Sequence, residues 1–153
     1  MLQRRKPIPK SVLHEADRLA HGYNQARQLA IANLLWIGFF YLLQPGEFLY
    51  TTKGRYPFNL GDIVLWVGAH EYSADTIPLH LMPQVSFAGL MFTMQKNGIP
   101  GEMIGLTASG APIACPVQAI ARRVQHIRLH VPNARDMPLY VYCDQAGISR
   151  RIS

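Results

Sequence analysis

Cysteine and long apolar runs are nearly absent from this chain. The 153 residues include 2 cysteines, Cys115 and Cys143, which are too few and too isolated for a disulfide framework or a zinc site. The longest apolar run, Leu29–Leu43, is interrupted by Asn33 and is shorter than the roughly 18–20 residues that cross a bilayer. We therefore expect reduced, buried thiols in an intracellular protein without a membrane span, and a nuclear location if the host is eukaryotic.

Targeting and cofactor motifs are also missing. The basic start, residues 1–6, leads into Pro-Ile-Pro and not into an apolar segment, so a secretory signal is not supported. No phosphate-loop pattern, Gly-x-Ser-x-Gly motif or catalytic Cys–His arrangement occurs. His126 and His130 stand four apart on a predicted helix, but no carboxylate completes a metal shell, and two surface histidines are the favoured interpretation. We expect neither a cofactor nor a metal.

Acidic residues are scarce relative to basic ones. There are 9 Asp and Glu against 15 Lys and Arg, which gives a formal net charge of +6 and a pI near 9.6. This imbalance favours a polyanionic partner. Charge alone does not separate DNA from RNA or from an anionic membrane surface.

Length and composition predict one domain with a packed core, because 49% of the 153 residues are hydrophobic. Residues 1–10 are predicted to be an exposed basic arm, residues 11–143 the folded domain, and residues 144–153 a polar, frayed tail. The predicted fold class is α+β, mainly helical, with a small antiparallel three-stranded sheet.

Apolar periodicity and turn residues place the elements. Helices are predicted at Ser11 to His21, at Asn24 to Leu43 and at Pro116 to His130. Strands are predicted at Asp62–Val67, Ser86–Met94, Met103–Thr107 and Leu139–Cys143, and the second and third of these form a hairpin. Residues 50–60 are predicted to be a loop, and residues 73–84 are expected to be irregular.

The last predicted helix has two faces. Its apolar face consists of Val117, Ile120, Ala121, Val124 and Ile127. Its other face is predicted to carry Arg122, Arg123, Gln125 and Arg128. This basic face is interpreted either as a surface for a DNA backbone or as an ordinary solvated face.

Two segments give the strongest functional indications. The apolar helix predicted up to Leu43 runs into Gln44-Pro45-Gly46-Glu47, which presents an amide and a carboxylate together at a helix end. Further along, the predicted hairpin has Lys96 in its turn. In this order the two segments resemble the catalytic domain of tyrosine recombinases, which are site-specific DNA integrases, especially those of crypton-like or retroelement-like mobile elements. The resemblance extends from Lys6-Pro7-Ile8-Pro9 through Cys115-Pro116-Val117 to the following helix.

The resemblance implies a partial DNA breaking-rejoining enzyme catalytic domain and transesterification at a DNA phosphate. In the family a tyrosine attacks the phosphate, forms a phosphotyrosyl bond, and the strand is later rejoined. Lys96 matches the turn lysine that protonates the leaving oxygen, and Glu47 matches the acidic residue that orients site residues. From the residues alone, a solvent-exposed turn lysine and a surface glutamate are the alternatives.

Gln44 departs from the family, which has at this position an arginine that grips the scissile phosphate. A neutral amide lacks the permanent charge and the planar donor fork of arginine. Removing one transition-state donor costs on the order of 10²–10³ in rate in other enzymes, and losing a charged bidentate contact should cost at least that. Strong strand-transfer activity is therefore not expected.

The second catalytic arginine and the tyrosine nucleophile are not where the family would place them. None of the six histidines is followed by an arginine three residues later, so the family's His-x-x-Arg motif is absent. Tyr140 and Tyr142 precede the expected place of that motif and are interpreted as structural. The chain is expected to be the N-terminal half of such a domain, with an uncovered apolar patch at Leu29–Leu43.

Two hypotheses of different class follow. The first is a catalytically incompetent recombinase-like protein, related to DNA recombination and integration, that binds double-stranded DNA through cationic residues: Arg4, Arg5, Lys6, Lys96, Arg122, Arg123 and Arg128. The second is a non-enzymatic interaction module whose exposed apolar helix pairs with a partner chain or a second copy. A complete small enzyme ranks third, because no self-contained catalytic set is present.

Overall fold

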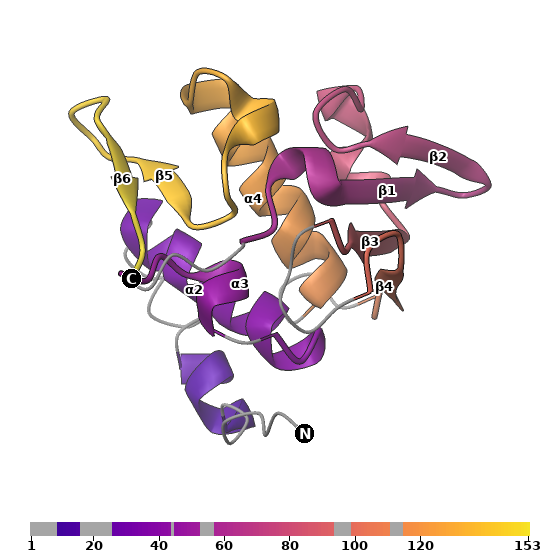
Figure 1. The fold of residues 1–153 in the computed structure, drawn as a ribbon, viewed down its shortest axis with the longest axis horizontal. Helices are drawn as coiled ribbons and strands as arrows, with labels where there is room; N and C mark the ends of the chain where they lie inside the picture. The colour runs from indigo at the N-terminus through magenta and orange to yellow at the C-terminus, as the bar shows by residue number, and fades with distance from the viewer. Residues whose placement is uncertain (1–8, 16–25, 44, 53–56, 94–98, 111–114) are drawn as a thin grey trace.

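The fold is α+β, with a four-stranded antiparallel sheet and a separate two-stranded sheet. The computed structural model describes residues 9–15, 26–43, 45–52, 57–93, 99–110 and 115–153. Helix α4 (Pro116–His130) lies between the two sheets, and helix α2 (Ala26–Phe40) packs along it (Figure 1). Residues 10–15 are also helical. Shorter helical segments are α3 (Pro45–Phe48), η1 (Leu60–Asp62), η2 (Leu79–Gln84) and η3 (Ala134–Asp136).

The larger sheet has the strand order β2-β1-β3-β4. Strands β1 (Ile63–Val67), β3 (Phe87–Met91) and β4 (Met103–Thr107) confirm the three predicted strands. The fourth strand, β2 (His70–Ser73), was not predicted, because its polar residues lack the alternation of a half-buried strand. It forms because a turn at Gly68, with a φ of +60°, folds the chain back onto β1. The prediction of a three-stranded sheet therefore missed one edge strand, β2.

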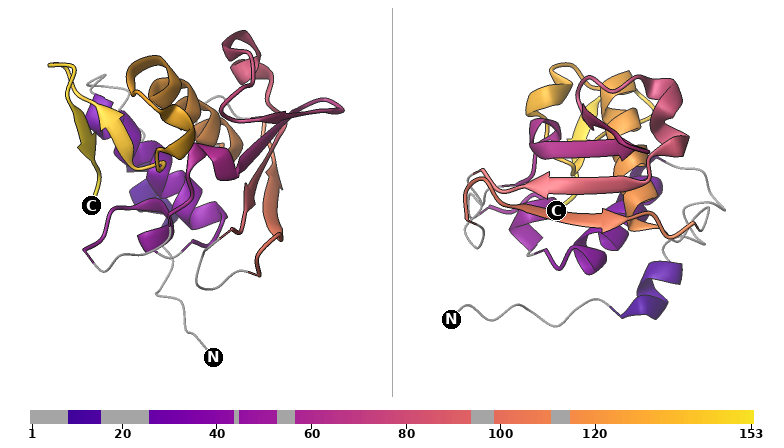
Figure 2. Two further views of the ribbon diagram at one scale, coloured as in Figure 1. Left: turned by 45° about the horizontal axis from the view of Figure 1, so that its top comes forward. Right: turned by 90° about the vertical axis from the view of Figure 1, so that its right-hand side faces the viewer.

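Helix α4 places its predicted apolar face in the core. All five residues of that face are at most 1% exposed, which confirms the prediction. Pro116 stands at the start of the helix, where its missing N–H costs no hydrogen bond. Figure 2 shows α4 behind the four-stranded sheet, on the side away from the viewer in the right-hand panel. The expected irregular segment at residues 73–84 contains η2, which packs against this helix.

The apolar run of α2 is covered by the chain itself. Its buried residues include Leu34, Trp36 and Ile37, each at most 1% exposed. Within Leu29–Leu43, Leu42 is the one large apolar side chain that is exposed, at 61%. The predicted uncovered patch is therefore wrong for most of this run, and self-association stays a prediction. Among the described residues, no helix combines the length and the apolar content that crossing a membrane requires.

The end of α2 explains why Leu42 points outward. Leu42 has a positive φ of 53°, and the N–H of Leu43 donates to the carbonyl of Gly38 at 3.0 Å. This is the backbone bond of a Schellman ending, and it stops the helix before the predicted boundary at Leu43.

Residues 144–153 are part of the fold, so the prediction of a frayed tail is wrong. Strand β6 (Ser149–Arg151) pairs with β5 (Val141–Cys143), which confirms the predicted last strand. A turn with Gly147 at a φ of +78° joins the two strands. Ile152 is 6% exposed, and its carbonyl accepts the N–H of Tyr50 at 2.8 Å. The pairing with β5, the turn and the buried Ile152 together order a segment whose composition is otherwise polar.

Candidate functional site

Glu47 lies in the short helix α3, directly after the break that follows α2. Its side chain is 5% exposed, so its alternative interpretation as a surface glutamate is wrong. A buried carboxylate cannot lie against a large polyanion, but it can hold neighbouring groups in place through hydrogen bonds. Gln44, its partner in the motif, lies outside the described residues.

The predicted hairpin forms at its base. The N–H of Phe92 donates to the carbonyl of Glu102 at 2.7 Å, and the N–H of Gly101 donates back to Phe92 at 2.8 Å. The hydroxyl of Thr93 donates to the carboxylate of Asp62 at 3.2 Å, which ties the hairpin to the start of β1. Lys96 belongs to residues 94–98, which the structure does not describe, so the choice between a site lysine and an exposed turn lysine stays a prediction.

A buried hydrogen bond joins the end of α2 to the strand that leads into the hairpin turn. The hydroxyl of Tyr41, three residues before the motif, donates to the carbonyl of Ala88 in β3 at 2.9 Å. Tyr41 is 2% exposed, and burial raises the pKa of its hydroxyl. The hydroxyl is therefore protonated at neutral pH and can donate this bond.

Phe58 provides a second link between the same two segments. Its N–H donates to the carbonyl of Glu47 at 3.0 Å, and its ring centroid lies 5.5 Å from that of Phe92. Phe58 itself is fully buried. The chain on both sides of Gln44 and the chain just before the lysine turn are thus anchored to one part of the core.

Arg123 is not on a solvated face, and its prediction as a DNA contact is wrong. The side chain is 2% exposed, its Nε donates to the carbonyl of Leu139 at 3.1 Å, and its Nη2 donates to the carbonyl of Val141. Burial lowers the pKa of Arg123 to about 10. A side chain so enclosed cannot reach a phosphate, and its role is to hold β5 against α4.

Arg122 and Arg128 are half-buried and each bonds to another element. Arg122 donates through Nε to the side-chain oxygen of Asn33 in α2 at 2.9 Å. Arg128 donates to the carbonyl of Ala74 at 3.5 Å and to that of Ile77. These two arginines fasten α4 to α2 and to the segment after β2, which leaves them little freedom to follow a DNA backbone.

His126 is half-buried and structural, which corrects its interpretation as a surface histidine. Its Nε2 accepts the N–H of Cys143 at 2.9 Å, so the ring is neutral and helps hold β5. Burial first, and then the charges of Arg123 and His130, lower the pKa of His126 to about 4. Among the described residues, no group of three or more His, Cys, Asp or Glu side chains is placed to hold a metal ion.

The depressed pKa of His126 predicts a loss of stability in mild acid. Below about pH 6.5 the unfolded chain takes up a proton that the folded chain refuses until about pH 4, so stability falls through this window. We expect a loss of about 1–2 kcal/mol at about pH 5 relative to pH 7, measured by urea denaturation. His126→Gln, which keeps an acceptor but does not titrate, should lose less.

His80→Gln is the matched control for this prediction, because His80 is exposed on η2. It should keep the pH dependence of the wild type. Equal acid losses in the wild type and in His126→Gln would contradict the assignment of the titration to His126.

Both cysteines are free, and Cys115 is fully buried, which confirms its prediction as a buried thiol. The N–H of Ser109 donates to its sulfur at 3.3 Å. Burial raises the pKa of this thiol, but hydrogen bonds from Gln118, Ser109 and Val117 lower it by more. Cys143 is half-buried beside His126.

Sequence reasoning missed three exposed arginines that lie at or near the C-terminal hairpin. Arg27, at the start of α2, and Arg150 and Arg151, in β6, are all exposed. The two arginines of β6 were assigned to a frayed tail, so nothing predicted that they would be held in place. Arg4, Arg5 and Lys6 of the predicted basic arm lie outside the described residues.

The resemblance to tyrosine recombinases rests on the motifs and their order. It stays a prediction, because Gln44 and the turn with Lys96 lie outside the described residues. No protein-family model, curated protein or solved structure matches this chain.

Proposed function

We propose that this chain is a DNA-binding domain related to tyrosine recombinases that does not complete the strand-transfer reaction by itself. Binding would be salt-sensitive and tolerant of sequence, because cationic side chains contact phosphates and not base edges. The net charge of +6 agrees with this kind of partner.

The observation that supports the proposal best is the anchoring of the two motif segments to one part of the core. The buried bond from Tyr41 to Ala88, together with Phe58 between Glu47 and Phe92, ties both segments to one structural unit. Two groups acting on one phosphate need this common support, because a misplacement of about 1 Å can cost about 10²-fold in rate.

The buried Glu47 adds to this support. Its 5% exposure suits a residue that positions its neighbours and does not contact the phosphate itself. The neutral Gln44 limits the chemistry, because an amide donates without a charge and cannot form the bidentate contact of a guanidinium. We therefore expect phosphate binding without efficient strand cleavage.

Restoring the family residue tests this function. Gln44→Arg should strengthen binding to a labelled duplex by about tenfold at low salt and steepen the plot of log Kd against log salt by about 0.9, the contribution of one phosphate contact. Lys96→Gln should weaken binding and flatten the plot by a similar amount. Fluorescence anisotropy over a salt series measures both.

Gln84→Arg is the matched control, because it adds the same charge at an exposed position of η2. It should change the affinity much less than Gln44→Arg. The proposal fails if the two variants bind equally well, or if the wild type does not bind duplex DNA even at low salt. A covalent protein–DNA adduct on a suicide substrate would show that the wild type cleaves unaided, which would also overturn it.

A further inference from the structure

Three arginines from two distant parts of the sequence line pockets at the C-terminal hairpin. Arg27 comes from the start of α2, and Arg150 and Arg151 are consecutive in β6. All three side chains are exposed. We call them the C-terminal arginine surface.

Arg150 is held in a fixed orientation. Its Nε donates to the carboxylate of Asp144 at 2.6 Å, and this bond and the charge of Arg150 hold the pKa of Asp144 below its usual range. The other oxygen of Asp144 accepts the N–H groups of Ala146 and Ile148 at 2.9 Å each, so the carboxylate is fixed by the turn. The terminal nitrogens of Arg150 are not used in this bond and can bind an anion.

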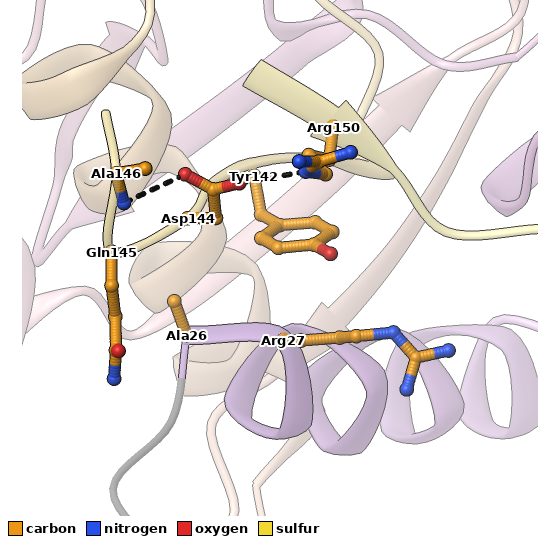
Figure 3. A pocket seen from close by; sticks show the side chains of 7 residues that line it. All are labelled: Ala26, Arg27, Tyr142, Asp144, Gln145, Ala146 and Arg150. Atoms are coloured by element: carbon orange, nitrogen blue, oxygen red, sulfur yellow. Dashed lines mark hydrogen bonds and ion pairs between the residues drawn. The ribbon is translucent and has the colours of Figure 1, made fainter. Parts of the chain in front are cut away.

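Arg150 and Arg27 line one open pocket of about 430 Å³ together with Tyr142. Figure 3 shows the Tyr142 ring between Arg150 and α2, with its hydroxyl on the side to which Arg27 extends. Tyr142 is 6% exposed, so its ring forms a rigid floor. A phosphate in this pocket would meet guanidinium donors and a phenolic hydroxyl.

Arg151 lies on the opposite face of β6, because side chains alternate along a strand. Its guanidinium carbon stands 3.9 Å from the centre of the Tyr50 ring, and Tyr50 packs edge-on against Tyr140. This stacking leaves the N–H groups at the guanidinium edge available for hydrogen bonds.

A second open pocket of about 700 Å³ adjoins Arg151, and its lining residues include Thr51, Thr52, Ser149 and Ser153. The hydroxyl oxygen of Thr51 is inaccessible to solvent, so Thr52, Ser149 and Ser153 carry the hydroxyl groups that a ligand in this pocket could meet. Arg150 lines this pocket as well as the first. The two pockets therefore adjoin at the side chain of Arg150, and we call the two together the path.

We propose that this path binds the sugar-phosphate backbone of a nucleic acid, with successive phosphates at Arg150 with Arg27 and at Arg151. The inference rests on the proposed function and adds a second contact surface to it. Asp144 is the one acidic side chain among the described residues that line the two pockets, and Arg150 neutralises it. The remaining positive charge and the hydroxyl donors fit a polyanion and not a protein surface of mixed charge.

Single substitutions to glutamine test the path. Arg27→Gln, Arg150→Gln and Arg151→Gln should each weaken binding to a labelled duplex by about 3–10-fold, and each should flatten the salt dependence by about 0.9. Arg27→Gln leaves the bond between Asp144 and Arg150 untouched, so its effect cannot come from a loosened hairpin. Circular dichroism and thermal midpoints check that all variants fold.

Arg135→Gln is the matched control, because its side chain is 72% exposed on η3. It should change the affinity less than twofold. If the wild type binds duplex DNA and all three surface variants behave like Arg135→Gln, the inference is overturned while the proposed function stands. If the wild type does not bind duplex DNA, the inference and the proposed function are both wrong.

Inorganic tripolyphosphate separates a nucleic-acid path from a site for a small anion. We expect it to compete with the duplex only weakly, because it cannot span both pockets. Tight binding of tripolyphosphate that depends on Arg27 and Arg150, with duplex binding unaffected by the same substitutions, would identify a small-polyphosphate site and overturn the inference.

Discussion

Replacing Arg123 by alanine is expected to lower the free energy of unfolding by about 3 kcal/mol. The side chain is 2% exposed and donates to the buried carbonyls of Leu139 and Val141. Each carbonyl left unpaired costs roughly 1–3 kcal/mol, and the cavity costs roughly 2–5 kcal/mol. Removal of a charge whose pKa burial has lowered offsets part of these costs.

Urea denaturation at neutral pH measures this loss, and two variants define its origin. Arg123→Met fills the space without making the bonds, so it should lie between the wild type and Arg123→Ala. Arg122→Ala removes a neighbouring half-buried arginine and should cost about 1 kcal/mol. A change below about 1 kcal/mol in Arg123→Ala would show that Arg123 does not hold the two carbonyls.

Hydrogen exchange gives Arg123→Ala a second readout. Amides of β5 and β6 should exchange faster than those of β1 and β3, because the lost bonds are made to the segment that leads into the C-terminal hairpin. Uniform acceleration across both sheets would instead indicate a global effect.

Gly38→Val is expected to destabilise the protein by about 2–3 kcal/mol through overpacking. A Cβ at Gly38 would stand 2.5 Å from the Phe48 ring, which is 4% exposed and has little room to move. Glycine inside a helix costs about 1 kcal/mol relative to alanine, so its presence in α2 needs a reason. The reason is the close approach of α3 to α2, which leaves no room for a side chain at position 38 and which positions Glu47.

The clash at Gly38 can be separated from helix propensity by two further variants. Arg27→Val places the same β-branched residue at an exposed position of α2 and should cost less than about 1 kcal/mol. The double variant Gly38→Val with Phe48→Ala should lose at least about 1 kcal/mol less stability than the sum of the two single-variant losses, because the smaller residue at position 48 removes the clash. Strict additivity would show that the two positions do not meet.

The sequence predicted α4 well and misjudged its arginines. The apolar stripe follows from local spacing, and every residue of it is buried. The same spacing could have predicted that Arg123 is buried, because Arg123 stands three residues after Ile120 and four before Ile127. Residues at these distances share a helix face, so a charged side chain there is buried unless the neighbouring surface is open.

The tail was misjudged for a different reason. Its composition is polar, and composition is a poor guide for a two-stranded hairpin that needs one turn and one buried residue. Gly147 supplies the turn, and Asp144 fixes both the turn and Arg150. These contacts join residues close in sequence, but the bond from Tyr50 to Ile152 joins distant ones and had no local indication.

The sequence alone determined the α+β class, the two long helices, the hairpin of β3 and β4 and the buried thiol of Cys115, because each follows from a repeating local pattern. Only the tertiary structure decided which charged groups are buried and which are free. It buried Glu47 and Arg123 and left Arg27, Arg150 and Arg151 exposed together. Exposure depends on which distant segment covers a face, and no local pattern encodes that.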